Sequence, residues 1–144
     1  MSRFQFSTFY IADRLYGIEV TQVQEVTRPM PMTLIRLAPS FIKGLINLRG
    51  QIATAIGLRE LFGMADNDSK EKMTVVCRVD GSLLSLLVDR IGDVMEMEHT
   101  SFEPSPDTVD PKMRRFMDGV YKTPQSIMSV ISVEKIYREL NLQN

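Results

Sequence analysis

Two side chains, Cys77 and His99, are the first candidates for chemistry, because each is the only residue of its type in the 144-residue chain. A catalytic thiol or imidazole needs an orienting partner, and no signature such as G-x-S-x-G accompanies either residue. A zinc site needs three or four ligands, which would have to be carboxylates here. Cys77 lies in the apolar run TVVCRV and is expected to be buried, whereas His99 is expected to be exposed and uncommitted. These residues predict no catalytic site, no metal site and no disulfide bond.

Composition narrows the function classes further. The phosphate-binding patterns G-x-x-x-x-G-K and G-x-G-x-x-G are absent, so no cofactor is predicted. The net charge is -1 and the basic residues are scattered singly, which argues against nucleic acid as a partner. No segment approaches the roughly 20 apolar residues that span a bilayer, and the start MSRFQFSTFY does not resemble a secretion leader. We therefore expect a cytoplasmic protein with no direct membrane insertion.

Polar residues in the middle of an apolar segment are the second candidate group. Within FIKGLINLRGQIATAIGLRELFG, counting by two predicts a core face and a solvent face. The predicted core face holds Ile46, Leu48, Ile52 and Ile56. The predicted solvent face holds Leu45, Asn47, Arg49 and Gln51. Either Arg49 acts at a binding surface, or it lies on a solvated strand face and pairs with an acid such as Glu25.

The elements that must position these residues are mostly strands. Alternating patterns predict strands at 3–12, 15–20, 33–37, 74–79, 83–88, 93–99 and 126–131. Hairpins are expected at the turns Asp13-Arg14 and Asp80-Gly81. Valines spaced by three predict a helical turn within VTQVQEV, Gly63 is expected to end a short helix, and ADNDSKEK is a predicted loop. VEKIYREL predicts a final amphipathic helix.

The chain also resembles itself. Leu15–Val26 matches Leu83–Val94 at an offset of 68 residues, and FIKGL and IATAIGLRELF match FMDGV and IMSVISVEKIY at an offset of 75. Two β-rich halves of roughly 70 residues are each too small for a comfortable core, so a shared or interlocked core is expected. The alternative is a chance match between apolar strands. Because the second copy has Lys122, Pro124 and Gln125 where the first has Asn47, Arg49 and Gly50, the repeat favours a surface role for Arg49.

Four runs together resemble the chemotaxis coupling protein family, the CheW-like domain. The runs are YGIEVTQVQEV, FIKGLINLRGQI, GLRELFG and LLVDRIGDVMEM, and the resemblance extends from about Phe4 to Leu140. It implies an all-β fold with short helices, in which two intertwined five-stranded Src-homology-3-like β-barrels share a core, followed by a C-terminal α-helix. Residues 1–144 would then form a single CheW-like domain of two pseudo-repeated barrel subdomains that exchange strands.

The resemblance also implies function. Family members are non-enzymatic adaptors that couple the cytoplasmic tips of transmembrane chemoreceptors to the regulatory domain of the histidine kinase CheA, in arrays at the inner membrane. Receptor contacts in the groove between the barrels would map to Val23, Glu25, Gly44, Asn47, Arg49 and Val94. In this interpretation Glu25 holds Arg49 by a salt bridge, and Gly44 permits close backbone approach. Kinase contacts cannot be assigned to residues. Thr54, Gly57 and Ser132 depart from the family pattern, and these changes are expected to retune the kinase-facing side.

Two other hypotheses stay open at this stage. The chain could be a paralogue that serves a different chemosensory pathway, such as surface motility or biofilm signalling, through the same surfaces. It could also be a small-barrel oligonucleotide-binding protein. That hypothesis needs stacking aromatic residues beside basic ones, whereas the chain has 8% aromatic residues, no Trp and no basic stripe.

Overall fold

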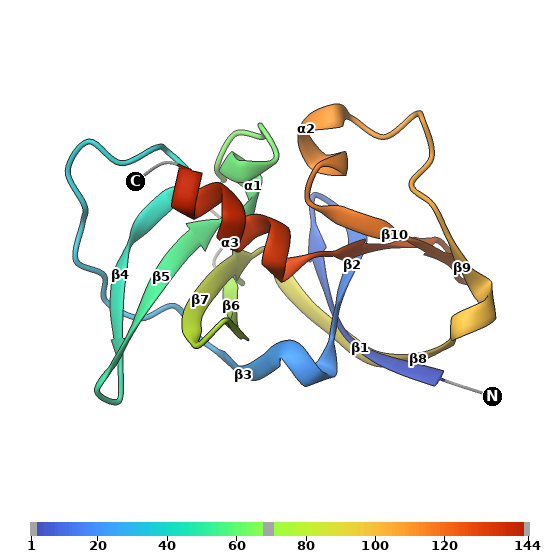
Figure 1. The fold of residues 1–144 in the computed structure, drawn as a ribbon, viewed down its shortest axis with the longest axis horizontal. Helices are drawn as coiled ribbons and strands as arrows, with labels where there is room; N and C mark the ends of the chain where they lie inside the picture. The colour runs from blue at the N-terminus through green and yellow to red at the C-terminus, as the bar shows by residue number, and fades with distance from the viewer. Residues whose placement is uncertain (1–2, 68–70, 143–144) are drawn as a thin grey trace.

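A computed structural model describes residues 3–67 and 71–142 of the chain, and most of these residues lie in β-strands (Figure 1). The strands are β1 (Arg3–Ile11), β2 (Arg14–Glu19), β3 (Val23–Thr27), β4 (Ile42–Leu48), β5 (Gln51–Gly57), β6 (Met73–Val79), β7 (Ser82–Val88), β8 (Arg90–Glu98), β9 (Phe102–Glu103), β10 (Met117–Lys122) and β11 (Ile127–Ile131). The helices are η1 (Val20–Gln22), α1 (Leu58–Leu61), η2 (His99–Ser101), α2 (Pro111–Arg114) and α3 (Val133–Leu142). Part of the predicted loop ADNDSKEK, residues 68–70, lies outside the described residues.

The strands form two sheets. One has six strands in the order β8-β1-β2-β11-β10-β9, and the other has five in the order β3-β6-β7-β5-β4. The predicted all-β fold, with two intertwined groups of strands, short helices and a C-terminal helix, is confirmed. One sheet has six strands instead of five because the two-residue strand β9 pairs with β10. Among the described residues, no helix is long and apolar enough to cross a membrane.

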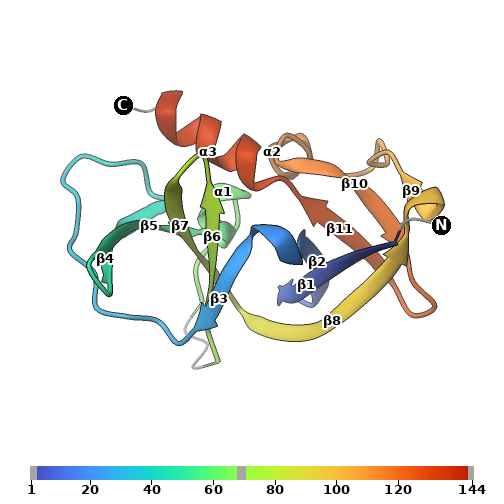
Figure 2. The ribbon, with the colours of Figure 1, turned by 60° about the horizontal axis from the view of Figure 1, so that its bottom comes forward.

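Each sheet takes strands from both halves of the chain. Strand β3 follows β2 in sequence but pairs with β6, as Figure 2 shows, while β8 pairs with β1. The two parallel pairs have the same register: Ala53 lies opposite Leu83 in one sheet, and Met128 lies opposite Leu15 in the other. These positions are related by the sequence offsets of 75 and 68 residues. The offsets found in the sequence therefore map one sheet onto the other strand by strand.

The largest apolar cluster draws on both sheets. Phe9 and Ile131 of the six-stranded sheet belong to the same buried cluster as Val75 and Leu86 of the five-stranded sheet. Tyr16 is fully buried in this cluster, where its ring stacks on Phe9 at a centroid distance of 5.7 Å. A stack of this kind adds about 0.5–1.5 kcal/mol to the stabilisation from burial. The expectation of a shared core is confirmed.

Two hairpins follow directly from their turn residues. Asp80 and Gly81 join β6 to β7 with φ angles of 49° and 77°, the left-handed pair that matches the twist of a two-residue hairpin. Ala12 and Asp13 join β1 to β2 in the same way, so this predicted turn is placed one residue too late. The final helix α3 begins at Val133 as predicted, and it buries Ile136 and Leu140.

The face assignment in the segment 41–63 is partly wrong. Ile46, Leu48 and Ile56 are buried, but Ile52 has 60% of its surface exposed. The segment is not one strand, because a two-residue turn at 49–50 divides it into β4 and β5. Asn47 lies opposite Ile52 across this hairpin, and cross-strand partners share a face, so Ile52 joins the polar side.

Of two other element predictions, one is partly confirmed and one is wrong. In VTQVQEV only Val20–Gln22 form a helical turn, and the remainder is strand β3, because pairing with β6 overrides the valine spacing. The predicted strand 33–37 is reduced to a single bridge between Thr33 and Leu45. Leu37 is fully exposed with a positive φ of 62°, so the backbone leaves the extended conformation within the predicted segment.

Candidate functional site

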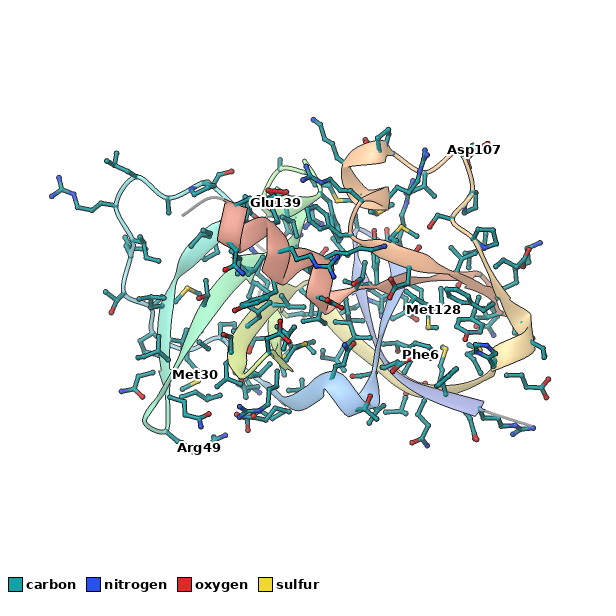
Figure 3. The ribbon with its side chains drawn as sticks, viewed as in Figure 1. Phe6, Met30, Arg49, Asp107, Met128 and Glu139 are labelled. Atoms are coloured by element: carbon teal, nitrogen blue, oxygen red, sulfur yellow. The ribbon has the colours of Figure 1, made fainter. Side chains whose placement is uncertain are left out.

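The candidate site is built around the turn between β4 and β5. Arg49 and Gly50 form this two-residue turn with φ angles of 53° and 90°. The backbone N–H of Gly50 donates to Oδ1 of Asn47 over 2.9 Å, which supports the left-handed turn from its own strand. Figure 3 shows Arg49 at the tip of the hairpin. The polar run within this apolar segment is therefore a turn, which explains how it avoids the core.

The Arg49 guanidinium is held by one partner. Its Nη2 donates to Oε1 of Glu25 over 2.5 Å, although 68% of the Arg49 side chain is exposed. Glu25 lies on β3 and Arg49 on the β4–β5 turn, and β3 and β4 are the two edge strands of the five-stranded sheet. The predicted pair is confirmed, and it joins the first and last strands of that sheet. An exposed pair stabilises a fold by only about 0.2–1 kcal/mol, so its main effect is to orient the guanidinium.

A second arginine, Arg78, contacts the residue that follows the turn, and it was not predicted from the sequence. Arg78 on β6 donates to Oε1 of Gln24 over 2.6 Å and to Oε1 of Gln51 over 3.4 Å. Gln51 directly follows the Arg49–Gly50 turn. Arg78 is the only charged residue in TVVCRV, and its outward position in a strand with buried neighbours was the signal that could have identified it.

Gly44 has a structural neighbour within the chain. A Cβ at this position would lie 2.7 Å from the backbone oxygen of Thr33 and 3.1 Å from Cβ of Met32, and its φ of 153° is unusual for other residues. Thr33 and Leu45 exchange two backbone hydrogen bonds of 2.8 Å at this point. The close approach expected at Gly44 is thus made by the preceding loop of the same chain.

The remaining predicted positions lie at different depths and on different sheets. Val23 shares strand β3 with Glu25, but it is partly buried against the main core. Val94 is exposed on β8 in the six-stranded sheet, where it lies opposite Ser7. The ion pair and the turn therefore place Glu25, Asn47 and Arg49 close together, whereas Val94 lies on the other sheet.

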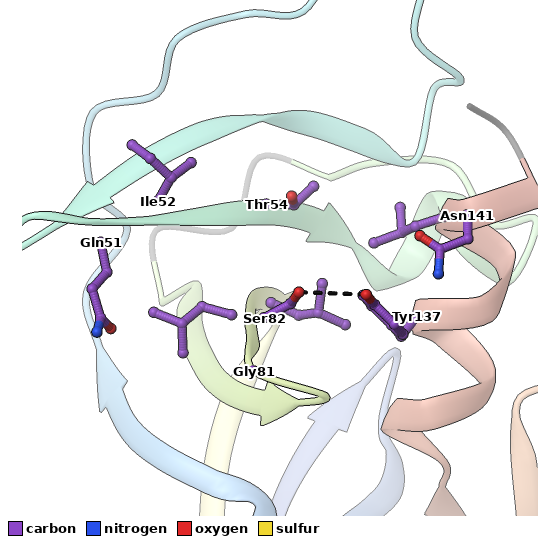
Figure 4. Close-up of a pocket in the computed structure, with 10 residues that line it drawn as sticks. Gln51, Ile52, Thr54, Gly81, Ser82, Tyr137 and Asn141 are labelled. Carbon is purple, nitrogen blue, oxygen red and sulfur yellow. Dashed lines mark hydrogen bonds between the residues drawn. The ribbon is translucent and has the colours of Figure 1, made fainter.

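A polar cavity of about 510 Å³ begins beside this turn. Figure 4 shows it between β5, the β6–β7 turn and helix α3. It is lined by Gln51, Ile52, Thr54, Gly81, Ser82, Leu83, Leu84, Tyr137, Leu140 and Asn141. Oγ of Ser82 donates to Oη of Tyr137 over 3.5 Å. None of these lining residues is acidic or basic, so the cavity offers hydrogen bonding but no acid–base pair.

A second cavity, of about 430 Å³, occupies the equivalent place on the six-stranded sheet. Its floor is formed by Asp13, Arg14, Leu15, Ser126, Ile127 and Ser129. By the two sequence offsets these residues correspond to Gly81, Ser82, Leu83, Gln51, Ile52 and Thr54. The opposite walls of the two cavities differ. Residues of α3 form this wall in the first cavity, whereas Pro106, Val109 and Met113 form it in the second. The cavities are thus a consequence of the repeated strand order.

The two residues first considered for chemistry lie outside these cavities. Cys77 is buried in the main core, and burial raises the pKa of its thiol to about 12. A thiol in this environment is a poor nucleophile at neutral pH. His99 is exposed on η2, and its ring contacts that of Phe4 at a centroid distance of 5.3 Å. Among residues 3–67 and 71–142, no group of three or more His, Cys, Asp or Glu side chains could hold a metal ion.

Comparisons with known proteins place this fold, in which two sheets share the largest apolar cluster, in a family. The CheW-like domain matches residues 5–141 of the chain. The chemotaxis protein CheW of Helicobacter pylori is 26% identical over 136 residues, which cover 94% of this chain and 82% of that protein. The CheW of Klebsiella aerogenes is 27% identical over 133 residues, with coverage of 92% and 80%. The crystal structure of the scaffolding protein TtCheW from Thermoanaerobacter tengcongensis matches with a TM-score of 0.83 and 31% identity, over 92% of this chain and 90% of that one.

The chain belongs to the CheW-like domain family. Its function is that of a coupling adaptor in chemotaxis signalling.

Proposed function

We propose that this adaptor joins the cytoplasmic tips of chemoreceptors to the regulatory domain of the kinase CheA, and that the Arg49 turn belongs to the receptor-binding surface. The observation that carries the proposal is the exposed Arg49 guanidinium held by Glu25. A guanidinium that is already oriented loses little entropy on binding and can donate several charge-assisted hydrogen bonds. Such a group can fix the direction of a receptor helix whose apolar stripe packs beside it.

The receptor-binding surface proposed here extends beyond the turn. It includes the family-matched positions Val23, Glu25, Gly44, Asn47, Arg49 and Val94. Val94 supplies exposed apolar surface on the neighbouring sheet, whereas Gly44 acts indirectly by letting the loop around Thr33 lie against β4. Arg78, which is oriented by Gln24 and Gln51, adds a second set of donors to the same surface.

We infer that the protein acts without catalysis, as one domain of two pseudo-repeated barrel subdomains. The inert environment of Cys77 and the lack of charged groups in the 510 Å³ cavity support a binding role. The matching registers of the two sheets support the subdomain division. In this proposal the protein works in the cytoplasm, in receptor arrays at the inner membrane, and two modest interfaces gain avidity from the array.

Co-sedimentation with receptor-containing membranes tests the receptor surface. We expect the wild-type protein to pellet with the membranes and Arg49→Glu to stay in the supernatant, because the new carboxylate repels the same receptor groups that the guanidinium binds. Binding of Arg49→Glu to purified CheA should be unchanged. Equal pelleting of Arg49→Glu and wild type would overturn the assignment of Arg49 to the receptor surface.

Arg138→Glu is a matched control for this experiment. Arg138 lies on α3, its side chain is 67% exposed, and its Nη2 donates to Oε1 of Glu134 over 2.6 Å. The substitution therefore makes the same charge change at an equally exposed, ion-paired arginine far along the chain. We expect Arg138→Glu to pellet with receptor membranes as the wild type does. A loss shared by both variants would show that net charge, and not the Arg49 turn, controls sedimentation.

A further inference from the structure

An aromatic cavity is lined by residues of the six-stranded sheet and of η2, and it is separate from the Arg49 turn. Its volume is about 220 Å³, and residues from β1, β2, β9, β10, β11 and η2 surround it. The lining residues are Phe4, Phe6, Glu19, His99, Phe102, Asp118, Tyr121 and Val130. Figure 3 shows Phe6 in this part of the molecule, beside the buried Met128. Five of the eight lining side chains carry aromatic rings. Phe6 and Tyr121 are buried behind the cavity, whereas His99 and Phe102 are exposed at it.

The rings contact one another in two groups. Tyr121 lies between Phe6 and Phe102, at centroid distances of 5.3 Å and 5.2 Å, and its ring is tilted against both. Phe4 and His99 meet edge to face at 5.3 Å. The face of an aromatic ring carries negative electrostatic potential, and a cation within about 6 Å of the ring centroid is attracted to it. Several rings around one small cavity combine this attraction.

Two carboxylates add to the negative potential. Glu19 and Asp118 both line the cavity, and no lysine or arginine does. Asp118 has Nζ of Lys135 at 3.4 Å. Among the described residues, Glu19 has no ion-pair partner, and its carboxylate only accepts a long hydrogen bond of 3.4 Å from Oγ1 of Thr21. Glu19 therefore places a negative charge beside the aromatic rings, and no cationic group in the described part of the chain pairs with it.

Among the described residues around the cavity, no basic one neutralises the charge of Glu19. A neighbouring cavity of about 280 Å³ shares Phe4 and Glu19, and its one basic lining residue, Arg3, already lies near Glu96 and Glu98 at 3.9 Å and 3.6 Å. Burial raises the pKa of the Tyr121 hydroxyl, and the negative charge of Glu19 raises it further. The field of Glu19 thus reaches the aromatic wall.

We propose that this cavity binds an organic ammonium cation, with a quaternary or N-alkylated ammonium head against the rings and Glu19 beside it. Anions are excluded by the two carboxylates. A bare metal ion would require more oxygen ligands than two carboxylates supply. A neutral apolar molecule would fill the cavity but would leave Glu19 without a partner at its wall. An alkylated ammonium group uses both the rings and the charge, and its small head suits 220 Å³.

Titration with choline and its neutral isostere tests the proposal. In 3,3-dimethylbutan-1-ol a carbon replaces the nitrogen, so the shape is kept and the charge is lost. We expect choline to shift the NMR signals of Phe102 and Tyr121 with a dissociation constant in the millimolar range. The neutral isostere should bind at least about fivefold more weakly. Equal affinity of the two compounds, or no choline-dependent shift at these residues, would overturn the proposal.

Variants separate the charge from the rings. Glu19→Gln keeps the shape of the side chain and removes its charge, so choline affinity should fall several-fold while binding of the isostere stays the same. Phe102→Leu should weaken choline more than the isostere, since it removes one π face. Glu98→Gln is the matched control, because Glu98 is a nearby carboxylate outside the cavity, and choline affinity should not change. Unchanged choline affinity in Glu19→Gln, with a native circular dichroism spectrum, would refute the role of the carboxylate.

Two sources could supply such a cation, and a second titration distinguishes them. Nα-acetyl-lysine methylamide and its Nε-trimethylated form represent a lysine side chain of a protein partner, and choline represents a free metabolite. Tighter binding of a lysine compound than of choline would assign the cavity to a partner side chain, and the reverse order would assign it to a small molecule. No residue that lines the cavity belongs to the proposed receptor-binding surface, so these results do not depend on that surface.

Discussion

Replacement of Asp89 by Asn is expected to destabilise the fold by about 3 kcal/mol, because it breaks a partly buried ion pair. Asp89 lies between β7 and β8. Nε of Arg59 donates to its Oδ1 over 2.9 Å and Nη2 of Arg59 donates to its Oδ2 over 2.6 Å, while the backbone N–H of Ala12 donates to Oδ2 over 2.8 Å. The Asp89 carboxylate therefore connects helix α1, which follows β5 of the five-stranded sheet, with the β1–β2 turn of the six-stranded sheet.

The magnitude follows from the burial of the pair. The side chains of Arg59 and Asp89 are 18% and 16% exposed. Removing one partner of a fully buried pair costs about 3–5 kcal/mol, and the residual exposure places this pair near the lower limit. For a chain of this length, about 3 kcal/mol corresponds to a fall in Tm of roughly 6–12 °C. Thermal and urea unfolding of wild type and Asp89→Asn at neutral pH measures the difference.

The pH dependence has a defined sign. Hydrogen bonds from Arg59 lower the pKa of Asp89 below its usual value, against the opposing effect of burial. A carboxyl group whose pKa is lower in the folded state stabilises the fold above its unfolded pKa, and this contribution is lost as the pH falls through the folded value. The stability difference between wild type and Asp89→Asn should therefore be constant near neutral pH and shrink in acid, below about pH 4. A difference of the same size throughout acid pH would contradict the ionic origin.

Asp118→Asn is the matched control for this prediction. Asp118 also pairs with a basic residue, Lys135 at 3.4 Å, but its side chain is half exposed. We expect this variant to lose less than about 1 kcal/mol. If the free energy of unfolding of Asp89→Asn also lay within about 0.5 kcal/mol of the wild-type value, the claim that this pair joins the two sheets would be refuted.

Three other perturbations have expected outcomes. Gly44→Ala should lower the free energy of unfolding by roughly 2 kcal/mol, because the new Cβ would lie 2.7 Å from the oxygen of Thr33 at a positive φ, and urea unfolding measures the loss. Ile52→Asp should change stability by less than about 0.5 kcal/mol, whereas Ile56→Asp should cost several kcal/mol on the scale of roughly 2–7 for a buried polar group, as circular dichroism melts would show. Cys77 should react with Ellman's reagent only after denaturation, since burial raises the pKa of its thiol to about 12. Unchanged stability of Gly44→Ala, similar stability of the two Ile variants, or rapid labelling of the native protein would each contradict the corresponding argument.

Much of the fold could be predicted because the decisive interactions are local. Asp80-Gly81 tolerates the left-handed turn of the β6–β7 hairpin, and the start of α3 follows from the amphipathic pattern after Val133. A shared or interlocked core could be inferred because two copies of one pattern recur at two offsets, whereas the exchange of strands was implied by the family resemblance. The predicted strand 33–37 failed because alternation of residue types does not reveal the left-handed backbone at Leu37, and only Thr33 bridges to β4.

The candidate site shows the same division between local and long-range interactions. Glu25 and Arg49 were predicted as partners, and the ion pair is present. The turn at Arg49–Gly50 was missed because period-two counting continues through a two-residue turn without a break. The same error placed Ile52 in the core. Arg78 was missed because its partners Gln24 and Gln51 are distant in sequence.

The sequence by itself determined the pattern of strands, the two offsets that make the halves equivalent, and the residue types at the exposed turn. It could do so because alternation, turn preference and repetition are properties of neighbouring residues. Only the tertiary structure decided which strands pair across the halves of the chain. It also decided that Glu25 on one edge strand forms an ion pair with Arg49 beside the other edge strand. The same holds for the aromatic rings of β1, η2, β9 and β10, which lie beside Glu19. These arrangements depend on contacts between residues that are far apart in the chain. Burial of the largest apolar cluster, which both sheets share, is the main driving force that holds the two sheets together.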